Sequence, residues 1–391
     1  MRNLSRRTLL AGAAALPAAL AGSNTLALGA RPSAAAVPKM SACAQALLES
    51  LDGAQRKAAW YRDLADSART KWSNFPAGAS PRAGISIADL TDHQRILVHD
   101  LLRASVSTQG YHKITGAIRA DDVLHDLQND NGFFGARNYY VSIFGSPQGS
   151  DWAWMFTGHH MTAVFTVSGN RIGFTPMFTG AQPLRIPTGL HAGWEVLPHD
   201  AGDAADLLAS LSADQRSVAV LGTSPPFDVV AGPGRQSSLA TFQGIAAGQL
   251  GDGQQHLLWQ LVDEFVGNAN NEAARAQLQL VKAAWAQTHF AWMGPSPDPS
   301  ARYYFRVHGP RILIEYDVQE PLANGGGHVH AIARDPQNDY GQDWLALHYT
   351  EGNPIPGHFG PPPNGVPPQG LPPNGGPPQG PPPASPLPNE R

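Results

Sequence analysis

The sequence contains a single cysteine, Cys43, and this scarcity excludes two kinds of site. One thiol cannot build an intramolecular disulfide framework, and it cannot supply the several thiolates of a zinc cage. The chain also lacks any run of about 18 apolar residues, so we expect no transmembrane helix. A metal site in this protein must therefore use nitrogen or oxygen ligands.

Positive charge is also scarce, because 27 Lys and Arg stand against 31 Asp and Glu among 391 residues. Residues 1–30 hold three Arg and no acid, so a chain without them would have a net charge near −7 instead of −4. Nucleic-acid binding needs a concentrated basic face. No cluster of Lys and Arg provides one, and we expect no nucleic-acid partner.

Three common catalytic motifs are missing. The sequence has no glycine-rich phosphate loop, no Gly-x-Ser-x-Gly elbow and no His-Glu-x-x-His helix. Their absence argues against P-loop nucleotide hydrolysis, ordinary esterase chemistry and the common type of zinc protease.

The amino terminus has the pattern of an export signal. Arg6 and Arg7 stand directly before an apolar, Ala-rich segment, and small residues follow. The pattern predicts that residues 1–30 address the twin-arginine export machinery, and that the protein reaches the periplasm or the extracellular space. This pathway carries folded proteins, many of which load a metal or cofactor before export. Residues 31–44 are then expected to be a linker.

The carboxyl terminus has a different pattern. Within residues 353–391, Pro-Pro-Asn-Gly and Pro-Pro-Gln-Gly alternate with a period of five residues. Proline removes backbone donors and glycine adds chain entropy, so this tail cannot build a core. We expect a disordered spacer with polyproline II character. The globular domain should therefore span residues 45–352.

The apolar periodicity between these ends alternates between two types. Residues 40–130 and 201–290 favour helices, whereas 138–186 and 302–334 favour strands. This alternation predicts an α+β fold in which helical blocks pack on antiparallel β-sheet hairpins in a single large domain. Segments 51–55, 90–94, 211–215 and 250–254 are similar to one another, and three have capping-box chemistry. We interpret them as helix starts and not as a repeat architecture.

The strongest chemical pattern is His328-Val329-His330. Histidines two residues apart on a strand face the same way, with Arg334 further along that face. Two adjacent imidazoles suit a borderline cation such as zinc, copper or iron. The glycines at 325–327 would let a ligand or a backbone approach closely.

A second pair of histidines follows Gly158. Bulky residues share even numbers before this glycine and odd numbers after it, so we expect a bulge or bend there. Adjacent histidines on a regular strand point to opposite sides. The pattern therefore leaves open whether His159 or His160 faces a site, or whether both are ordinary core or surface residues.

A polar strand face accompanies these histidines. A tight turn at Gly309-Pro310 would place Tyr304 opposite Glu315 and Arg306 opposite Leu313. One face would then carry Tyr304, Arg306, His308, Glu315 and Asp317. This face is either a solvated surface or a catalytic one. In the loop that follows, Asp339 or Asp343 could orient a ligating imidazole, or could simply cap the loop.

These segments together resemble a known family. Residues 154–160, 303–315, 328–336, 339–341 and 348–349 are similar to the family called domain of unknown function 3500. The resemblance covers roughly residues 45–352. It implies one domain of family length and supplies no activity.

The residues themselves predict a single mononuclear site. Its ligands would be His328, His330 and one or more of His159, His160, His308 and His348, and its ion would be copper, iron or zinc. Three imidazoles leave an open coordination position, which is typical of a catalytic site. Arg306 or Arg334 would hold an anionic or polar group of a small-molecule substrate, and Glu315 or Tyr304 would move protons.

The sequence thus predicts an exported metal-dependent enzyme, with an oxidoreductase or oxygenase as the leading hypothesis. The alternatives are a zinc-dependent hydrolase and a non-catalytic protein that binds a metal or a ligand. No pattern in the sequence specifies an oligomeric state.

Overall fold

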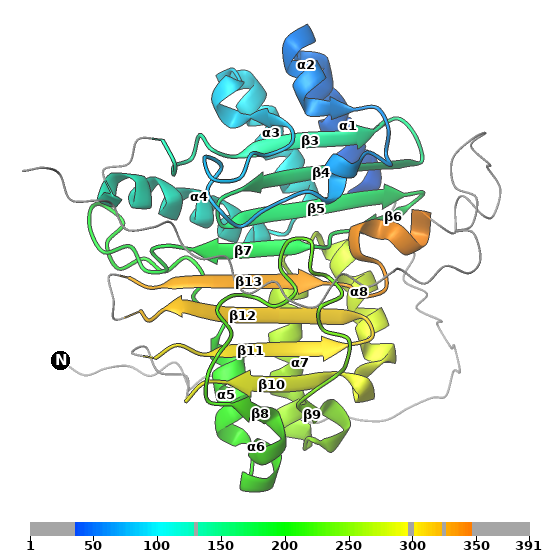
Figure 1. Cartoon of the computed structure of the whole chain (residues 1–391). Helices are drawn as coiled ribbons and strands as arrows, with labels where there is room; N and C mark the ends of the chain where they lie inside the picture. The colour runs from blue at the N-terminus through cyan, green and yellow to red at the C-terminus, as the bar shows by residue number, and fades with distance from the viewer. Residues whose placement is uncertain (1–35, 129–131, 296–300, 323–325, 346–391) are drawn as a thin grey trace, which may run out of the picture. The chain divides into compact units, whose positions relative to one another are not determined.

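The strands of this protein join in one mixed sheet, and helices cover one of its faces (Figure 1). The computed structural model describes residues 36–128, 132–295, 301–322 and 326–345. Within these ranges the sheet has 13 strands. All of them belong to one compact unit, so the expected α+β fold in a single domain is confirmed.

The two halves of the sheet place equivalent strands in the same order from the edge to the middle. From one edge to the middle the strands are β1 (Trp60–Tyr61), β3 (Tyr140–Gly145), β4 (Asp151–Gly158), β5 (Met161–Ser168) and β7 (Met177–Ala181). From the middle to the other edge they are β13 (His328–Arg334), β12 (Ile312–Glu320), β11 (Tyr304–Gly309), β10 (His289–Met293) and β8 (Val220–Gly222). Short strands pair beside this path, namely β2 (Ile85–Ser86) on β3, β6 (Arg171–Gly173) on β5 and β9 (Ile245–Ala246) on β10. The two halves meet where β7 and β13 pair antiparallel.

The helices repeat in the same way. The first half contains α1 (Ala36–Ser50), α2 (Gly53–Ala59), α3 (Asp92–Ser105) and α4 (Thr108–Gln128). The second half contains α5 (Gly202–Ser210), α6 (Ala213–Ala219), α7 (Asp252–Val266) and α8 (Asn271–Ala283). In each half, two helices precede the first short strand, and the other two lie between the second short strand and the strand that follows it. The domain is therefore an internal repeat with a local two-fold axis between β7 and β13, where the upper and lower halves of Figure 1 meet.

The similar sequence segments are equivalent positions of the two repeats. In the first half, the side chains of Gln55 and Gln94 hydrogen-bond each other at 2.8–3.0 Å, and in the second half Gln215 and Gln254 do so at 2.9 Å. The interpretation that these segments mark helix starts is confirmed. The conclusion that they do not reflect a repeat architecture is wrong.

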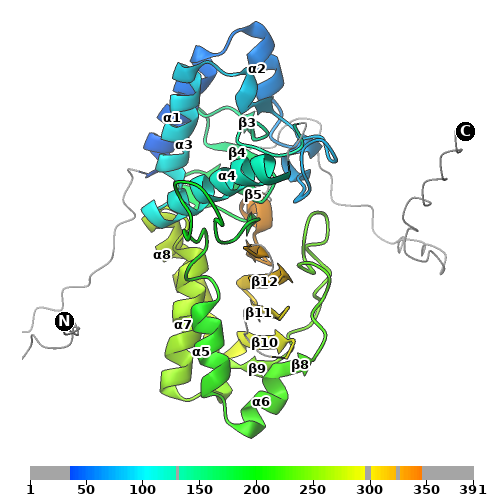
Figure 2. The ribbon, with the colours of Figure 1, turned by 90° about the vertical axis from the view of Figure 1, so that its left-hand side faces the viewer.

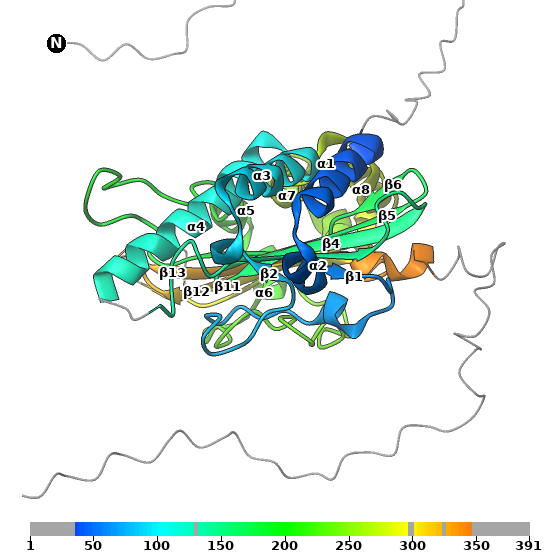
Figure 3. The same cartoon turned by 90° about the horizontal axis from the view of Figure 1, so that it is seen from above.

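The two faces of the sheet differ in chemistry. Large apolar residues such as Trp154, Phe165 and Tyr316 are buried on the face covered by α1, α3, α4, α5, α7 and α8 (Figure 2). The other face carries polar residues and is covered by two connecting segments, 62–84 and 223–244 (Figure 3). These segments occupy equivalent places, because one joins β1 to β2 and the other joins β8 to β9. The strands that carry the candidate histidines, β11 and β13, both contribute side chains to the polar face.

The amino-terminal boundary differs from the expected one. Residues 36–44 of the expected linker 31–44 form the first part of α1, and Met40 and Ala44 are fully buried. The apolar residues of α1 recur every three or four positions, so they form one stripe along the helix. This stripe packs on α3 and is therefore buried. The expected export signal, the proline-rich tail and residues 346–352 of the expected domain lie outside the described residues.

Two details of the strands also differ from expectation. The predicted bend near Gly158 is a hairpin, because Gly158 pairs with Met161 and leaves His159 and His160 as a two-residue turn. The change of parity thus marks a reversal of the chain. Within residues 138–186, where strands were expected, the part after β5 is divided into two short strands, β6 and β7, and β6 forms a hairpin with β5.

The register of the β11–β12 hairpin is shifted by two residues. Arg306 lies opposite Glu315, and Tyr304 lies opposite Asp317, because Gly309 pairs with Ile312 and the turn is formed by the residues between them. A shift of two residues preserves the face on which each side chain lies. The predicted composition of the polar face therefore stands.

No helix within the described ranges is long and apolar enough to span a bilayer.

Candidate metal centre

Three imidazole nitrogens converge on the polar face, beside the β4–β5 turn and the start of β13. The Nε2 atom of His328 lies 2.9 Å from Nε2 of His160 and 3.1 Å from Nε2 of His330. Ligands bound tetrahedrally at about 2.0–2.1 Å from one ion are about 3.4 Å apart, so these atoms are close to a ligand spacing. Of the predicted metal ligands, the structure brings together His328, His330 and His160.

A glycine on the neighbouring strand makes this approach possible. Gly180 of β7 pairs with His330, and its amide donates to the carbonyl of His160 at 2.7 Å. A Cβ atom on Gly180 would lie 3.0 Å from Cδ2 of His160 and 3.2 Å from Cδ2 of His330. His160 itself has a left-handed backbone with φ of 57°. No sequence pattern singles out Gly180, because its importance depends on the pairing of β7 with β13.

An aspartate orients one of the three imidazoles. Oδ1 of Asp228, in segment 223–244, lies 2.8 Å from Nδ1 of His330, and Asn74 of segment 62–84 donates to Oδ2 of Asp228 at 2.9 Å. Burial alone would raise the pKa of Asp228, but its bonds to His330 and Asn74 lower it, so the carboxylate is ionised. An ionised carboxylate only accepts, so Nδ1 of His330 carries the proton and Nε2 keeps its lone pair. This is the outer-shell arrangement of ligating histidines.

The aspartates expected in this role lie elsewhere. Asp339 bonds Arg334, and Asp343 is exposed. Asp228 and Asn74 were missed because they belong to two segments far apart in the sequence. No spacing relates either of them to a histidine.

His159 supports the cluster and does not complete it. Its Nδ1 lies 2.6 Å from Oδ1 of Asp121, and its ring stacks on His160 with centroids 3.6 Å apart at 29°. Asp121, His159 and His160 also bring ligand atoms within 4.8 Å of one another. The in-plane lone pairs of stacked rings do not converge on one ion, however. We therefore assign His159 and Asp121 to the positioning of His160.

The electrostatics keep the rings of His160 and His328 neutral. Burial, followed by the neighbouring histidines, holds the pKa of His160 well below its usual value. Burial, His330 and His159 lower the pKa of His328 to about 2. Neutral imidazoles present lone pairs, which is the form that binds metal ions.

His308 is not part of the cluster, contrary to its place among the predicted ligands. His308 pairs with Leu313 and His289, beside the turn of the β11–β12 hairpin. His330 of β13 pairs with Asp317, which lies toward the other end of this hairpin, so the two histidines are far apart along the strands. His308 instead packs against the ring of Phe242 at a centroid distance of 4.7 Å. His348 lies outside the described residues.

The position of His308 predicts a specific pH dependence. Burial, Arg306 and His289 lower the pKa of His308 from 6.5 to about 4. Between pH 6.5 and pH 4 the His308 side chain binds a proton in the unfolded chain and stays unprotonated in the folded chain. His308 therefore reduces the free energy of unfolding as pH falls from 6.5 to 4. A His308→Gln variant should therefore lose less stability between about pH 7 and about pH 5 than the wild type, measured by urea unfolding.

A matched replacement of the exposed His256 on α7 should leave the wild-type pH dependence unchanged. An equal loss of stability in the wild type and in His308→Gln would contradict the assignment of His308 as a buried neutral residue.

The predicted catalytic residues hold segment 223–244 on the sheet. Glu315 accepts hydrogen bonds from the amides of Val230 and Ala231 at 2.6 and 2.7 Å, and from the hydroxyl of Tyr304 at 2.7 Å. Burial raises the pKa of Glu315, and these three bonds oppose the rise. The protein itself thus supplies all three hydrogen-bond donors to the Glu315 carboxylate.

The two predicted arginines have the same role. Arg334 is buried, donates to the carbonyls of Ala231 and Gly232 at 2.8 and 3.0 Å, and pairs with Asp339. Arg306 donates to Gln243 of the same segment. The hydrogen bonds of both guanidinium groups are directed at the protein and not at an open site.

One further carboxylate is close to the three histidines. Asp317 pairs with His330 across the sheet, and its buried Oδ1 accepts no hydrogen bond among the described residues but forms a long ion pair with Nη2 of Arg302 at 3.9 Å. Burial raises the pKa of Asp317 to about 7, although Arg302 lowers it in part. Of the carboxylates on the polar face, Asp317 is therefore better placed than Glu315 to exchange a proton near the cluster.

Comparisons with known proteins give one match. A family model described as "Protein of unknown function (DUF3500)" matches residues 33–342. Neither the curated proteins nor the solved structures contain a match.

Proposed function

The chain belongs to the DUF3500 family, whose description names no activity, and we propose from the site alone that it is an enzyme that depends on one metal ion. The ion would be bound by the Nε2 atoms of His160, His328 and His330. The observation that carries the proposal is the convergence of three imidazole nitrogens, one of whose rings is oriented by an ionised aspartate.

The ligand set favours a catalytic ion over a structural one. Three nitrogen ligands leave at least one coordination position open, whereas structural zinc sites use four protein ligands. His160 and His330 are buried, but His328 is partly exposed, so the open side can be reached past His328. An all-imidazole set suits copper, iron or zinc.

We propose an oxidoreductase as the leading function. Copper or iron bound by these histidines would supply redox or oxygen chemistry. The substrate should be a small polar molecule. Arg306 and Arg334 bond the protein itself, so the proposal no longer uses them to hold an anionic group.

A metal-dependent hydrolase is the second candidate, and Asp317 is the observation in its favour. Its Oδ1 is buried, accepts no hydrogen bond within the described residues, and lies 3.9 Å from the guanidinium of Arg302. It is on the same face as His330, where it could accept a proton from a water molecule. This role requires zinc, which activates water without redox chemistry.

Metal analysis tests both candidates. Protein purified from its native compartment should contain about one equivalent of a single transition metal, measured by elemental analysis. After removal of the metal, Cu²⁺ should bind with a stoichiometry of one, and its electron paramagnetic resonance spectrum should show nitrogen couplings from imidazole. Copper or iron in the native protein supports the oxidoreductase, and zinc supports the hydrolase. Failure to bind any of these ions in either preparation contradicts the metal centre.

We also propose that the protein is exported through the twin-arginine pathway to the periplasm or beyond. The Arg6-Arg7 pair and the apolar segment after it support this proposal. Export of a folded protein would allow the ion to be inserted before export.

A further inference from the structure

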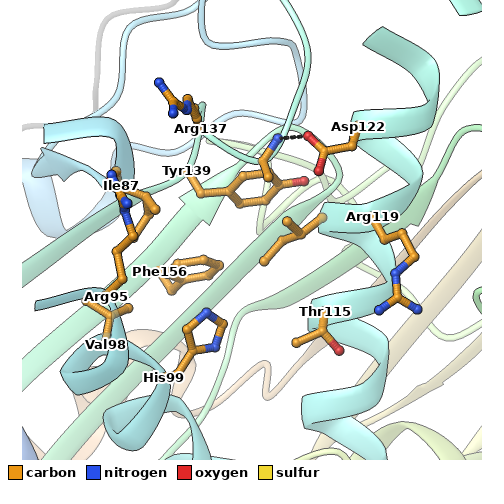
Figure 4. A pocket seen from close by; sticks show the side chains of 12 residues that line it. Ile87, Arg95, Val98, His99, Thr115, Arg119, Asp122, Arg137, Tyr139 and Phe156 are labelled. Atoms are coloured by element: carbon orange, nitrogen blue, oxygen red, sulfur yellow. Dashed lines mark hydrogen bonds between the residues drawn. The ribbon is translucent and has the colours of Figure 1, made fainter. Parts of the chain in front are cut away.

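A second site lies on the helix-covered face of the first half, away from the histidines. A cavity of about 420 Å³ opens between α3, α4 and residues 132–138 (Figure 4). Its floor is formed by Tyr139 and Phe156, which are buried and stack with centroids 5.6 Å apart at 16°. Val98 and Ile118 add apolar walls. The interior of the cavity therefore suits an apolar group.

The rim of the cavity is positively charged. Arg119 and Arg137 are exposed, and neither has an ion pair within the described part of the chain. The guanidinium of Arg119 lies over the ring of Trp194 at 5.2 Å. The one acid of the lining, Asp122, accepts a bond from the amide of Ala136 at 2.5 Å (Figure 4). Two guanidinium groups thus remain able to bind an anion.

Arg95, which also lines the cavity, is not in the same state. It donates to the carbonyl of Ile87 at 3.0 Å and pairs with Asp92 at 2.7 Å. We therefore assign anion binding to Arg119 or Arg137 and leave Arg95 as part of the wall.

The second half of the protein shows how the same place looks when it is filled. The two-fold relation between α3 and α7 matches Arg95 with Gln255 and His99 with Trp259. Trp259 packs edge-to-face on Trp285 at 5.2 Å, and Nε1 of Trp285 donates to Gln255 at 3.0 Å. Two indole rings therefore pack here in the second half, whereas the first half has a smaller His99 and a cavity. The opening is a property of one repeat and not of the fold.

We propose that this cavity binds a monocarboxylic acid with a compact apolar body. The apolar body would contact Phe156 and Tyr139. The carboxylate would be bound at the rim by Arg119 or by Arg137, which lie on opposite sides of the cavity (Figure 4). A volume of about 420 Å³ lies at the small end of the range for ligand pockets. The proposal does not depend on the metal centre, because the two sites lie on opposite faces of the sheet.

Isothermal titration calorimetry with octanoate, benzoate and inorganic phosphate tests the proposal on the full chain. Octanoate or benzoate should bind with a stoichiometry of one, and phosphate at least about tenfold more weakly because it has no apolar body. Arg119→Gln or Arg137→Gln should weaken carboxylate binding about tenfold, since the variant of the arginine that binds the carboxylate loses a charge-assisted contact. Arg275→Gln, at an exposed position on α8, should bind as the wild type does.

A filled variant provides a separate test. His99→Trp introduces the residue found at the equivalent position of the second half, and it should abolish binding. Its melting temperature and circular dichroism spectrum verify that it folds, and the two arginine variants test the proposal if it does not. The proposal is overturned if neither acid binds saturably, if phosphate binds as tightly as the acids, if both arginine variants bind normally, or if folded His99→Trp still binds.

Discussion

Replacing His328 and His330 together by Ala should remove the metal from the protein while leaving it folded. The two side chains provide two of the three converging nitrogens, and both lie on one strand whose backbone pairing does not involve them. Loss of an outer-shell partner alone costs about 10–100-fold in metal affinity, so the loss of two ligands should cost more than about 100-fold. Elemental analysis of purified protein and a Cu²⁺ titration measure this effect, and any metal-dependent activity should disappear with the ion.

Three further variants make this prediction specific. Asp228→Asn should lower the affinity for the metal ion by about 10–100-fold without abolishing binding, because it removes the carboxylate that orients His330. His308→Ala and His256→Ala should retain the full metal content, since His308 lies at the far end of its hairpin and His256 is exposed on α7. A fully occupied His328/His330 double variant would refute the centre.

Glu315→Ala should destabilise the protein by about 3–5 kcal/mol, even though Glu315 resembles a catalytic acid in the sequence. The carboxylate is fully buried and accepts bonds from two backbone amides and the hydroxyl of Tyr304. Alanine would leave all three donors without a partner, and each buried unsatisfied group costs about 1–3 kcal/mol. Urea unfolding at neutral pH measures the change.

Two matched variants separate anchoring from catalysis. Glu315→Gln keeps one of the two acceptor atoms and should lose less stability than Glu315→Ala. Glu49→Ala, at an exposed position on α1, should change the free energy of unfolding by no more than about 0.5 kcal/mol. If Glu315→Ala removed activity with its stability intact, Glu315 would act in the reaction and not as an anchor.

Period-two alternation was sufficient to predict much of the site. His328 and His330 share a face for the geometric reason given by their spacing, and the polar face of β11 and β12 has the predicted composition. The predicted hairpin register was wrong by two residues, but an even shift leaves each side chain on its original face. The α+β class followed from blocks of helical and strand periodicity.

The remainder depended on contacts that no local pattern contains. The choice of His160 over His159 follows from a two-residue turn whose second residue has a left-handed backbone. Asp228 and Asn74 reach the site from connecting segments with no periodicity. The anchoring contacts of Glu315 and Arg334 could not be predicted, because buried anchors and catalytic groups use the same residue types, and only their bonding partners distinguish them.

The local two-fold axis relates the two ends of the central strand pair, β7 and β13. The turn that carries His160 in the first half matches the turn of Arg311 in the second, and Arg311 bonds Asp335 at 2.6 Å. In a dimer of two identical subunits, one substitution would change both ends at once. Because both halves of this protein belong to one chain, a substitution changes one end alone. One end therefore has three converging histidines, and at the other end the counterpart of His160 is an arginine paired with an aspartate.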